Sequence, residues 1–359
     1  MVERKKKKVF VGLSGGVDSS VAALLLRDEG YEVIGVHIKG YNIDGCGEVD
    51  ALDARRAAGR IGIPFFVWDM EEEYKKKVVD YMLLGYRRGV TPNPDVMCNK
   101  EIKFGLFLEK ALEYGADYIA TGHYVQRIED KGRIRLFAAD DKTKDQSYFL
   151  WTLTQKELKK SLFPLGSLLK KDVRKIALKA GLNTAAKRDS QGICFLGKVN
   201  MSDFLGKFIK KNPGPIITTD GDVVGTHKGL SFYTIGQRHL DAGELDFGRR
   251  GNEAVRPHYV ARKDEKNNAL IIAEGSDNPA LFTKEIALKN ANIQSGNKIF
   301  SGRVLARVRY RQPVSSAFFK ISDKRGKIVF DKPQKFVASG QSAVFYSDEG
   351  EMIGGGVII

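Results

Sequence analysis

The stretch KKVFVGLSGGVDSSVAALLLRDEG, residues 7–30, decides the fold that we predict for this chain. Residues 9–13 are mostly apolar and predict a buried strand that ends in a glycine turn, and residues 17–30 then follow helical spacing up to a capping glycine. Further strands are predicted at YEVIGVHIK, PFFVWDM and ADYIATGH, residues 31–39, 64–70 and 116–123, with helical patterns between them. This alternation predicts an α/β fold with a doubly wound parallel sheet, which binds ligands at the carboxyl ends of its strands.

The second half of the chain has a different pattern. KKDVRKIALKAGL, residues 170–182, still predicts a helix, but short strands separated by Gly, Asn and Asp follow it. The last stretch, which includes RVLARVRYRQ at residues 303–312, predicts a small β-barrel or sandwich. We therefore expect a catalytic domain over residues 1–205, a small α+β domain over residues 206–279 and a C-terminal β-barrel over residues 280–359.

Composition limits the classes of protein to consider. The 359 residues include 59 Lys and Arg against 44 Asp and Glu, a net charge of +15, which predicts a polyanionic partner such as nucleic acid. The alternative is a merely basic surface or a thermophile-like composition. Three cysteines, Cys46, Cys98 and Cys194, are too few for a disulfide framework and favour a reducing compartment. Because we find neither a signal peptide nor an apolar run long enough to span a membrane, we expect a cytoplasmic protein.

A glycine-rich loop, GLSGGVDSS at residues 12–20, joins the first predicted strand to the first helix. Its backbone N–H groups and the hydroxyls of Ser14, Ser19 and Ser20 can bind phosphate, although a tight turn with an ordinary serine cap is the alternative. The loop lacks both the Gly-Lys-Ser/Thr ending of a Walker loop and the G-x-G-x-x-G dinucleotide pattern. SGGVDSS resembles the pyrophosphate-binding loop of the N-type ATP pyrophosphatases, which transfer the adenylyl group of ATP to a carbonyl oxygen.

Seven further motifs narrow this resemblance to one family. In chain order they are TPNPDVMCNKEIKF (91–104), TGHY (121–124), KDQSYFL (144–150), DSQGICFLG (189–197), YTIGQR (233–238), RVRYRQ (307–312) and GQSAVFY (340–346). Over essentially the whole chain they resemble the MnmA/TrmU family of tRNA-uridine 2-sulfurtransferases. The resemblance implies a PP-loop domain, a small central domain and a C-terminal β-barrel. It also implies 2-thiolation of the wobble uridine of tRNA through an adenylated uridine and a cysteine persulfide, with release of AMP and pyrophosphate.

The resemblance also implies roles for individual residues. Cys194 would carry the persulfide, Cys98 would be the partner thiol, and Asp95 would act as an acid or base. ATP would be bound by Gly12, Leu13, Ser14, Gly15, Gly16, Val17, Asp18, Ser19, Ile38 and Gly122, with Asp18 also helping to hold Mg²⁺. The target base would contact Asn93, Pro94, Asp95 and His123, and the rest of the tRNA would contact Lys144, Asp145, Gln146, Arg309, Tyr310, Arg311 and Gln341. A cysteine desulfurase or a sulfur-relay protein would donate the sulfur to a monomeric enzyme.

The residues around Cys98 give a second argument for a reactive thiol, independent of the family resemblance. It precedes a helix predicted from KEIKFGLFLEKAL, residues 100–112, and lies near Lys100 and Lys103, so we expect a lowered thiol pKa. The alternative is a small buried cysteine. For Cys194, the apolar neighbours alone would suggest burial. The cysteines, or two of them with Asp95, would also suit an iron–sulfur cluster, although no C-x-x-C spacing supports this.

Two other functions remain open from the residues alone. A different PP-loop amidotransferase or ligase would need neither cysteine. A basic RNA-binding protein with a vestigial ATP loop would explain the charge and the strand-like RVRYRQ, in which basic side chains alternate with an aromatic one as phosphate binding and base stacking require. A solvated strand face is the alternative for that motif.

Overall fold

The computed structural model describes residues 6–41, 46–188, 200–238, 240, 245, 256–297 and 299–359. The N-terminal part is built on a five-stranded sheet of order β3-β2-β1-β4-β7, in which every neighbouring pair is parallel. Its strands are β1 (Lys8–Gly12), β2 (Glu32–Lys39), β3 (Phe65–Asp69), β4 (Tyr118–Ala120) and β7 (Ser161–Leu162). The predicted parallel α/β sheet is therefore confirmed.

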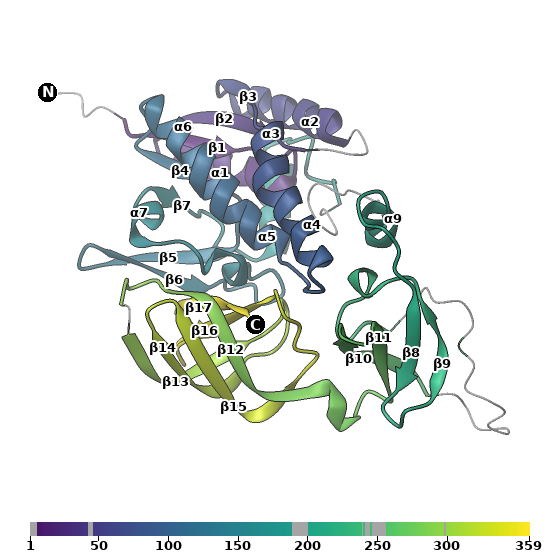
Figure 1. The fold of residues 1–359 in the computed structure, drawn as a ribbon. Helices are drawn as coiled ribbons and strands as arrows, with labels where there is room; N and C mark the ends of the chain where they lie inside the picture. The colour runs from purple at the N-terminus through teal and green to yellow at the C-terminus, as the bar shows by residue number, and fades with distance from the viewer. Residues whose placement is uncertain are drawn as a thin grey trace, which may run out of the picture.

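Helices cover both faces of this sheet, as Figure 1 shows. One face packs against α1 (Val17–Asp28), α2 (Cys46–Ile61) and α8 (Lys170–Lys179) in one apolar cluster. The other face packs against two long helices, which run over 71–87 and 94–113 and belong to a second cluster. The alternating strands and amphipathic helices of the sequence thus produce a doubly wound domain, because each apolar face needs a partner.

Both long helices contain a π-helical stretch. The first consists of α3 (Glu71–Tyr74), η1 (Lys75–Val79) and α4 (Asp80–Arg87), and the second of α5 (Pro94–Met97), η2 (Cys98–Leu106) and α6 (Phe107–Glu113). The second helix was predicted to start near residue 100, which is wrong. It starts at Pro94, because the side chain of Asn93 accepts a hydrogen bond from the Val96 N–H and proline suits the first helical position.

A hairpin and short helices complete the first part of the chain. The hairpin pairs β5 (Val125–Asp130) with β6 (Arg133–Ala138) and reaches the barrel through a bridge between Phe137 and Glu351. The helices are η3 (Ser147–Leu150) and α7 (Gln155–Leu158). No helix in the described residues is both long and apolar enough to cross a bilayer.

The central part contains a four-stranded sheet of order β10-β11-β8-β9, in which only β8 and β11 are parallel. Its elements are α9 (Met201–Gly206), β8 (Gly214–Thr218), β9 (Val223–His227), η4 (Leu230–Phe232), β10 (His258–Asp264), β11 (Ala269–Glu274) and η5 (Pro279–Leu281). In Figure 1 this sheet stands to the right of the C-terminal barrel.

The C-terminal part is a closed six-stranded barrel of order β12-β15-β14-β13-β16-β17, which decides between the barrel and the sandwich in favour of the barrel. Its strands are β12 (Phe282–Ile293), β13 (Ile299–Arg307), β14 (Ser315–Ser322), β15 (Arg325–Lys335), β16 (Ser342–Tyr346) and β17 (Met352–Ile358). Phe319 and Phe345 stack inside it with their ring centroids 4.0 Å apart. The prediction of a strand through residue 312 is wrong, because β13 ends at Arg307 and the next residues form a turn in which Arg311 has a positive φ of 65°.

Candidate active site

The glycine-rich loop follows β1 and ends where α1 begins, so it lies at the carboxyl edge of the parallel sheet. Gly15 has a φ of +75°, and a Cβ there would overlap the carbonyl oxygen of Asp50, so only glycine fits. Gly16 starts α1 without a side-chain cap, and Ser14 is exposed. An uncapped helix N-terminus beside an exposed hydroxyl is an anion-binding arrangement, which fits the phosphates of ATP.

The serines of the loop differ in what they offer to a ligand. The hydroxyl oxygens of Ser14 and Ser19 lie 3.2 Å apart, and the Ser14 N–H donates to the Ser19 hydroxyl. Ser20 is fully buried, and its hydroxyl donates to the carbonyl of Gly16. The Ser19 hydroxyl also donates to this carbonyl over 3.2 Å, so donation by Ser19 and Ser20 to phosphate stays a prediction.

Asp18 is the charged residue of the loop, and two residues from distant parts of the chain hold it. The Tyr124 hydroxyl donates to its Oδ1 over 2.7 Å, and the Lys170 ammonium lies 2.7 Å from each carboxylate oxygen. Lys170 is the first residue of α8, and only 11% of its side chain is exposed. Sequence reasoning missed this cation beside the anion site, since nothing in KKDVRKIALKAGL distinguishes it from the other lysines.

Two more of the expected ATP contacts lie near this loop. Gly122 follows β4, and a Cβ there would come within 2.7 Å of the Ser19 backbone nitrogen, so a larger residue would displace the start of α1. Ile38 lies in β2, opposite Trp68 of β3, and packs half-buried against the apolar core. Gly122 thus lies against the anion site, whereas the contact of Ile38 with adenine stays a prediction.

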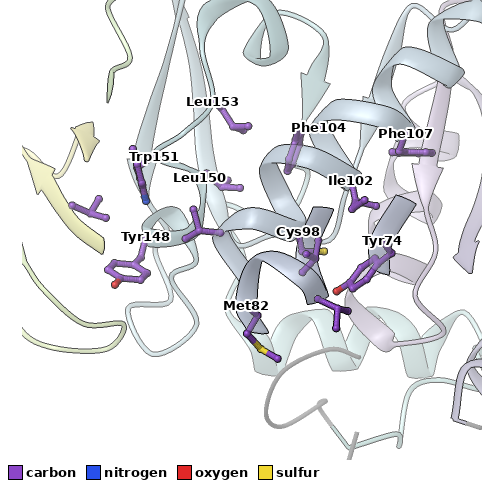
Figure 2. Close-up of a cluster of buried hydrophobic side chains, with 14 of the residues drawn as sticks. Tyr74, Met82, Cys98, Ile102, Phe104, Phe107, Tyr148, Leu150, Trp151 and Leu153 are labelled. Atoms are coloured by element: carbon purple, nitrogen blue, oxygen red, sulfur yellow. The ribbon is translucent and has the colours of Figure 1, made fainter. Parts of the chain in front are cut away.

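Cys98 belongs to the second long helix, and its side chain lies in the apolar cluster that Figure 2 shows, with 5% of its surface exposed. The expectation of a lowered thiol pKa is wrong: burial raises the pKa of Cys98. Lys103 and a hydrogen bond from Tyr74 both favour the thiolate, but they do not overcome the cost of burying its charge. The helix N-terminus does not help either, because the helix begins four residues before Cys98.

The residues just before Cys98 form the N-terminus of this helix. Asn93 is its cap, because its side chain accepts a hydrogen bond from the Val96 N–H, and Pro94 is its first residue. Asp95 lies three positions before Cys98, on the same helical face, and the burial of its carboxyl raises its pKa. The structure therefore places near each other a carboxyl and a thiol whose pKa values are both raised by burial.

His123 lies next to this helix. Its ring packs 5.9 Å from that of Phe104, and its Nδ1 lies 2.8 Å from the Thr121 hydroxyl oxygen. Burial, with a further contribution from Lys103, holds the pKa of His123 well below its usual value, so the ring is neutral. His123 can therefore donate or accept a hydrogen bond, but it does not supply a positive charge for phosphate.

The KDQ segment expected to contact tRNA is partly a structural element. Asp145 is buried, and its carboxylate binds the Arg307 guanidinium of the barrel at 2.5 Å and the backbone N–H groups of Ala139 and Ser147. Gln146 accepts a hydrogen bond from the Tyr124 N–H, and Lys144 is half-buried. Asp145 thus joins two parts of the protein, and only 5% of its surface is exposed.

The expected contacts on the barrel also divide into two kinds. Arg309 donates to the carbonyl of Ile235 over 2.6 Å, and Gln341 donates to the carbonyls of Thr91 and Pro92, so both join parts of the protein. Tyr310 packs 4.4 Å from Phe149, and Arg311 is exposed beside it with its guanidinium 5.2 Å from the Tyr310 ring. Tyr310 and Arg311 therefore form an aromatic and cationic surface.

Cys194, the residue on which the sulfur chemistry depends, lies outside the described residues, so its position relative to Cys98 stays a prediction. The side chain of Cys46 is not described either. Within the described part of the chain, no three His, Cys, Asp or Glu side chains are grouped as a metal site. The iron–sulfur alternative is therefore neither supported nor tested by these residues.

Family models match almost the entire chain. The model of the tRNA methyl transferase HUP domain matches residues 7–198, that of the tRNA methyl transferase PRC-barrel domain matches residues 202–274, and that of the aminomethyltransferase beta-barrel domain matches residues 283–358. A solved structure of a 4-thiouridine synthetase with RNA and bound ATP is 19% identical, covers 56% of this chain and 50% of its own, and has a TM-score of 0.35, too low to support an argument.

Curated relatives are similar over nearly their whole length. The tRNA-specific 2-thiouridylase MnmA of Streptococcus agalactiae serotype III is 43% identical over 365 residues, which cover 100% of this chain and 96% of the relative. MnmA of Streptococcus mutans serotype c is 44% identical with the same coverage, and MnmA 2 of Geobacillus kaustophilus is 45% identical over 98% of this chain and 94% of its own. Because the motifs, the domain models and full-length relatives agree, the chain belongs to the MnmA family of tRNA-specific 2-thiouridylases.

Proposed function

We propose that the protein catalyses ATP-dependent 2-thiolation of the wobble uridine of tRNA. The observation that carries this proposal is the sequence identity of 43–45% to 2-thiouridylases over nearly the full chain, combined with the anion-binding loop at Gly15 and the buried thiol of Cys98. The other PP-loop enzymes that we considered would have no use for this thiol. We further propose that the three parts of the chain divide near residues 205 and 280.

In the first half of the reaction, ATP activates the base. The carbonyl oxygen at C2 of uridine is a poor leaving group. Its attack on the α-phosphorus of ATP forms an O–P bond to the adenylyl group and releases pyrophosphate, so that the oxygen can later leave as part of AMP. The uncapped start of α1 and the Ser14 hydroxyl bind the phosphates, and Lys170 lies within reach of the same site. Mg²⁺ would be held by Asp18 and would neutralise charge on the leaving pyrophosphate.

In the second half, sulfur replaces the activated oxygen. The terminal sulfur of a Cys194 persulfide attacks C2, the bond from C2 to the adenylated oxygen breaks, and AMP leaves. The Cys98 sulfur then attacks the inner sulfur of Cys194, which releases 2-thiouridine and leaves a Cys98–Cys194 disulfide for an external thiol to reduce. The alternative order, in which Cys98 first frees the terminal sulfur, forms the same disulfide. A desulfurase or relay protein reloads Cys194.

Cys98 needs a base before it can attack, because its buried thiol is protonated. We assign this role to Asp95, three residues earlier on the same helix, since burial makes its carboxylate a stronger base than an exposed one. The neutral ring of His123 and the Asn93 cap are proposed to lie along the target base. For the remainder of the tRNA, we propose contacts with Lys144, Gln146, Tyr310 and Arg311, whereas Asp145 is buried against Arg307.

The test uses the full-length protein with an unmodified tRNA transcript. We expect exchange of radiolabelled pyrophosphate into ATP that depends on the tRNA, and 2-thiouridine in the nucleoside mass spectrum when a persulfide donor is added. Cys194→Ala and Cys98→Ser should each abolish thiolation and leave tRNA binding intact, whereas Cys46→Ala should thiolate normally. Exchange without tRNA would indicate a different PP-loop enzyme, and binding without pyrophosphate release would indicate an RNA-binding protein.

A further inference from the structure

The segment just before the catalytic helix, residues 89–92, is held by the barrel. The Thr91 N–H donates to the carbonyl of Ser339 over 2.8 Å, and the Gln341 amide nitrogen donates to the carbonyls of Thr91 and Pro92 over 3.0 and 2.9 Å. Both bonds from Gln341 end on main-chain oxygens. They therefore fix the path of the backbone, whatever the side chains of the segment are.

The barrel turn that makes these contacts, residues 338–341, is itself fixed. The Gly340 N–H donates to the carbonyl of Ile358, and the Ile358 N–H donates to the carbonyl of Gln341, which ties the turn to the end of β17. Gly340 has a φ of +90°, and a Cβ there would lie 2.7 Å from the Thr91 carbonyl oxygen. Glycine is thus required both by the turn and by the close approach of the segment.

The central part of the protein holds the same segment from another side. The Thr91 hydroxyl donates to that of Thr234 over 3.2 Å, and the ammonium of the half-buried Lys263 donates to the Gly89 carbonyl over 2.8 Å. A Cβ on Gly89 would overlap the carboxylate of Glu265. Three of these four residues, Gly89, Thr91 and Pro92, therefore form hydrogen bonds with groups that lie more than 140 residues away in the sequence.

The residue after this segment is Asn93, whose side chain caps the helix that carries Asp95 and Cys98. In Figure 1 this helix starts at α5, directly above the barrel. Any movement of residues 89–92 is passed on to the cap and thus to the carboxyl and the thiol. The contacts are consequently placed where they can control the geometry of the active site.

We propose that residues 89–92 and the groups that bond them form an interdomain clamp, and that Gln341 is a positioning residue that sets the place of Asn93, Asp95 and Cys98. The family resemblance assigned Gln341 to tRNA contact. However, its amide nitrogen has two hydrogens, and both are donated to the clamp, so only the carbonyl oxygen remains for RNA. The catalytic consequence rests on the proposed function, whereas the clamp itself does not.

The experiment compares Gln341→Met, which keeps the shape of the side chain and removes the donor, with the unsubstituted protein. Hydrogen exchange of the full-length protein, read by mass spectrometry over residues 90–97, should become faster at Thr91, Val96 and Met97, whose amides depend on the clamp and the cap. With two hydrogen bonds lost, we expect a fall of roughly tenfold or more in the single-turnover thiolation rate at saturating tRNA. The Kd for tRNA should change less than about twofold.

Gly340→Ala disturbs the same contact sterically and should reproduce the faster exchange and the slower rate. The matched control is Gln334→Met, which removes a glutamine that donates to the Lys332 carbonyl within the barrel and is more deeply buried than Gln341. This variant should change neither the exchange nor the rate. Unchanged exchange in both clamp variants, or a weaker Kd with an unchanged rate at saturation, would overturn the proposal. If the unsubstituted protein forms no 2-thiouridine, the proposed function fails, but the exchange data still test the clamp.

Discussion

Replacing Arg307 should separate the barrel from the catalytic domain more than any exposed charge change would. Its guanidinium binds the Asp145 carboxylate at 2.5 Å and the Tyr346 hydroxyl at 2.6 Å, and all three side chains are buried. Arg307→Met leaves the Asp145 carboxylate in the interior with two backbone N–H donors, from Ala139 and Ser147, and no cation. Removing one partner of a buried ion pair costs about 3–5 kcal/mol, because the remaining charge is desolvated without compensation.

The double variant Arg307→Met with Asp145→Asn leaves no charge at this pair. Its free energy of unfolding should therefore fall by only about 1–2 kcal/mol, less than that of Arg307→Met alone. Urea unfolding followed by the fluorescence of Trp151 measures this, in a common Trp68→Phe background. Trp151 is a suitable probe, because its indole N–H donates to the Ser342 hydroxyl of the barrel over 3.0 Å. Its signal therefore reports loss of the contact between the two domains.

Arg303→Met is the matched control, since Arg303 lies on the same strand and binds Asp331 at 2.6 Å with 69% of its side chain exposed. An exposed pair of this kind contributes less than about 1 kcal/mol. Equal losses of unfolding free energy in Arg307→Met and Arg303→Met would refute the argument from burial. So would a double variant that is less stable than either single one, because the network would then not be coupled through the Asp145 charge.

Three further outcomes follow from the site. Gly15→Ala should weaken ATP binding by roughly tenfold or more in calorimetry, because a methyl group there meets the Asp50 carbonyl and φ is positive; retained affinity would contradict the loop geometry. Lys170→Met should also raise the Kd for Mg-ATP about tenfold, since a charge-assisted contact is lost beside Asp18, whereas the neighbouring Lys171→Met should not. Burial raises the pKa of Cys98, so the rate of its alkylation by iodoacetamide should rise only at a pH above the range in which the same cysteine titrates in the urea-unfolded chain. A rise below that range would be evidence against a buried neutral thiol.

Local sequence predicted those parts of the fold that depend on local causes. The alternation of apolar strands with amphipathic helices gave the parallel sheet, and the glycines of residues 12–16 gave a turn in which Gly15 does adopt a positive φ. The hairpin of β5 and β6 was not predicted, although its strands alternate and Gly132 marks the turn. What the sequence could not predict are contacts between residues far apart along the chain. Asp18 meets Lys170 across 152 residues, and Gln341 meets Thr91 across 250.

The wrong expectation for Cys98 has the same origin and suggests how the enzyme controls its thiol. Neighbours along the chain, Lys100 and Lys103, argue for a thiolate, but burial by residues from the first long helix and from the sheet outweighs them. A permanently ionised thiol would react with any electrophile or oxidant that reached it. A buried neutral thiol that shares its helix face with Asp95 instead becomes reactive only when its surroundings change or its proton is accepted. In the proposed reaction, binding of the activated base beside Asn93 provides that change, and the proposed clamp at residues 89–92 is where contacts from the barrel and from the central part meet this helix.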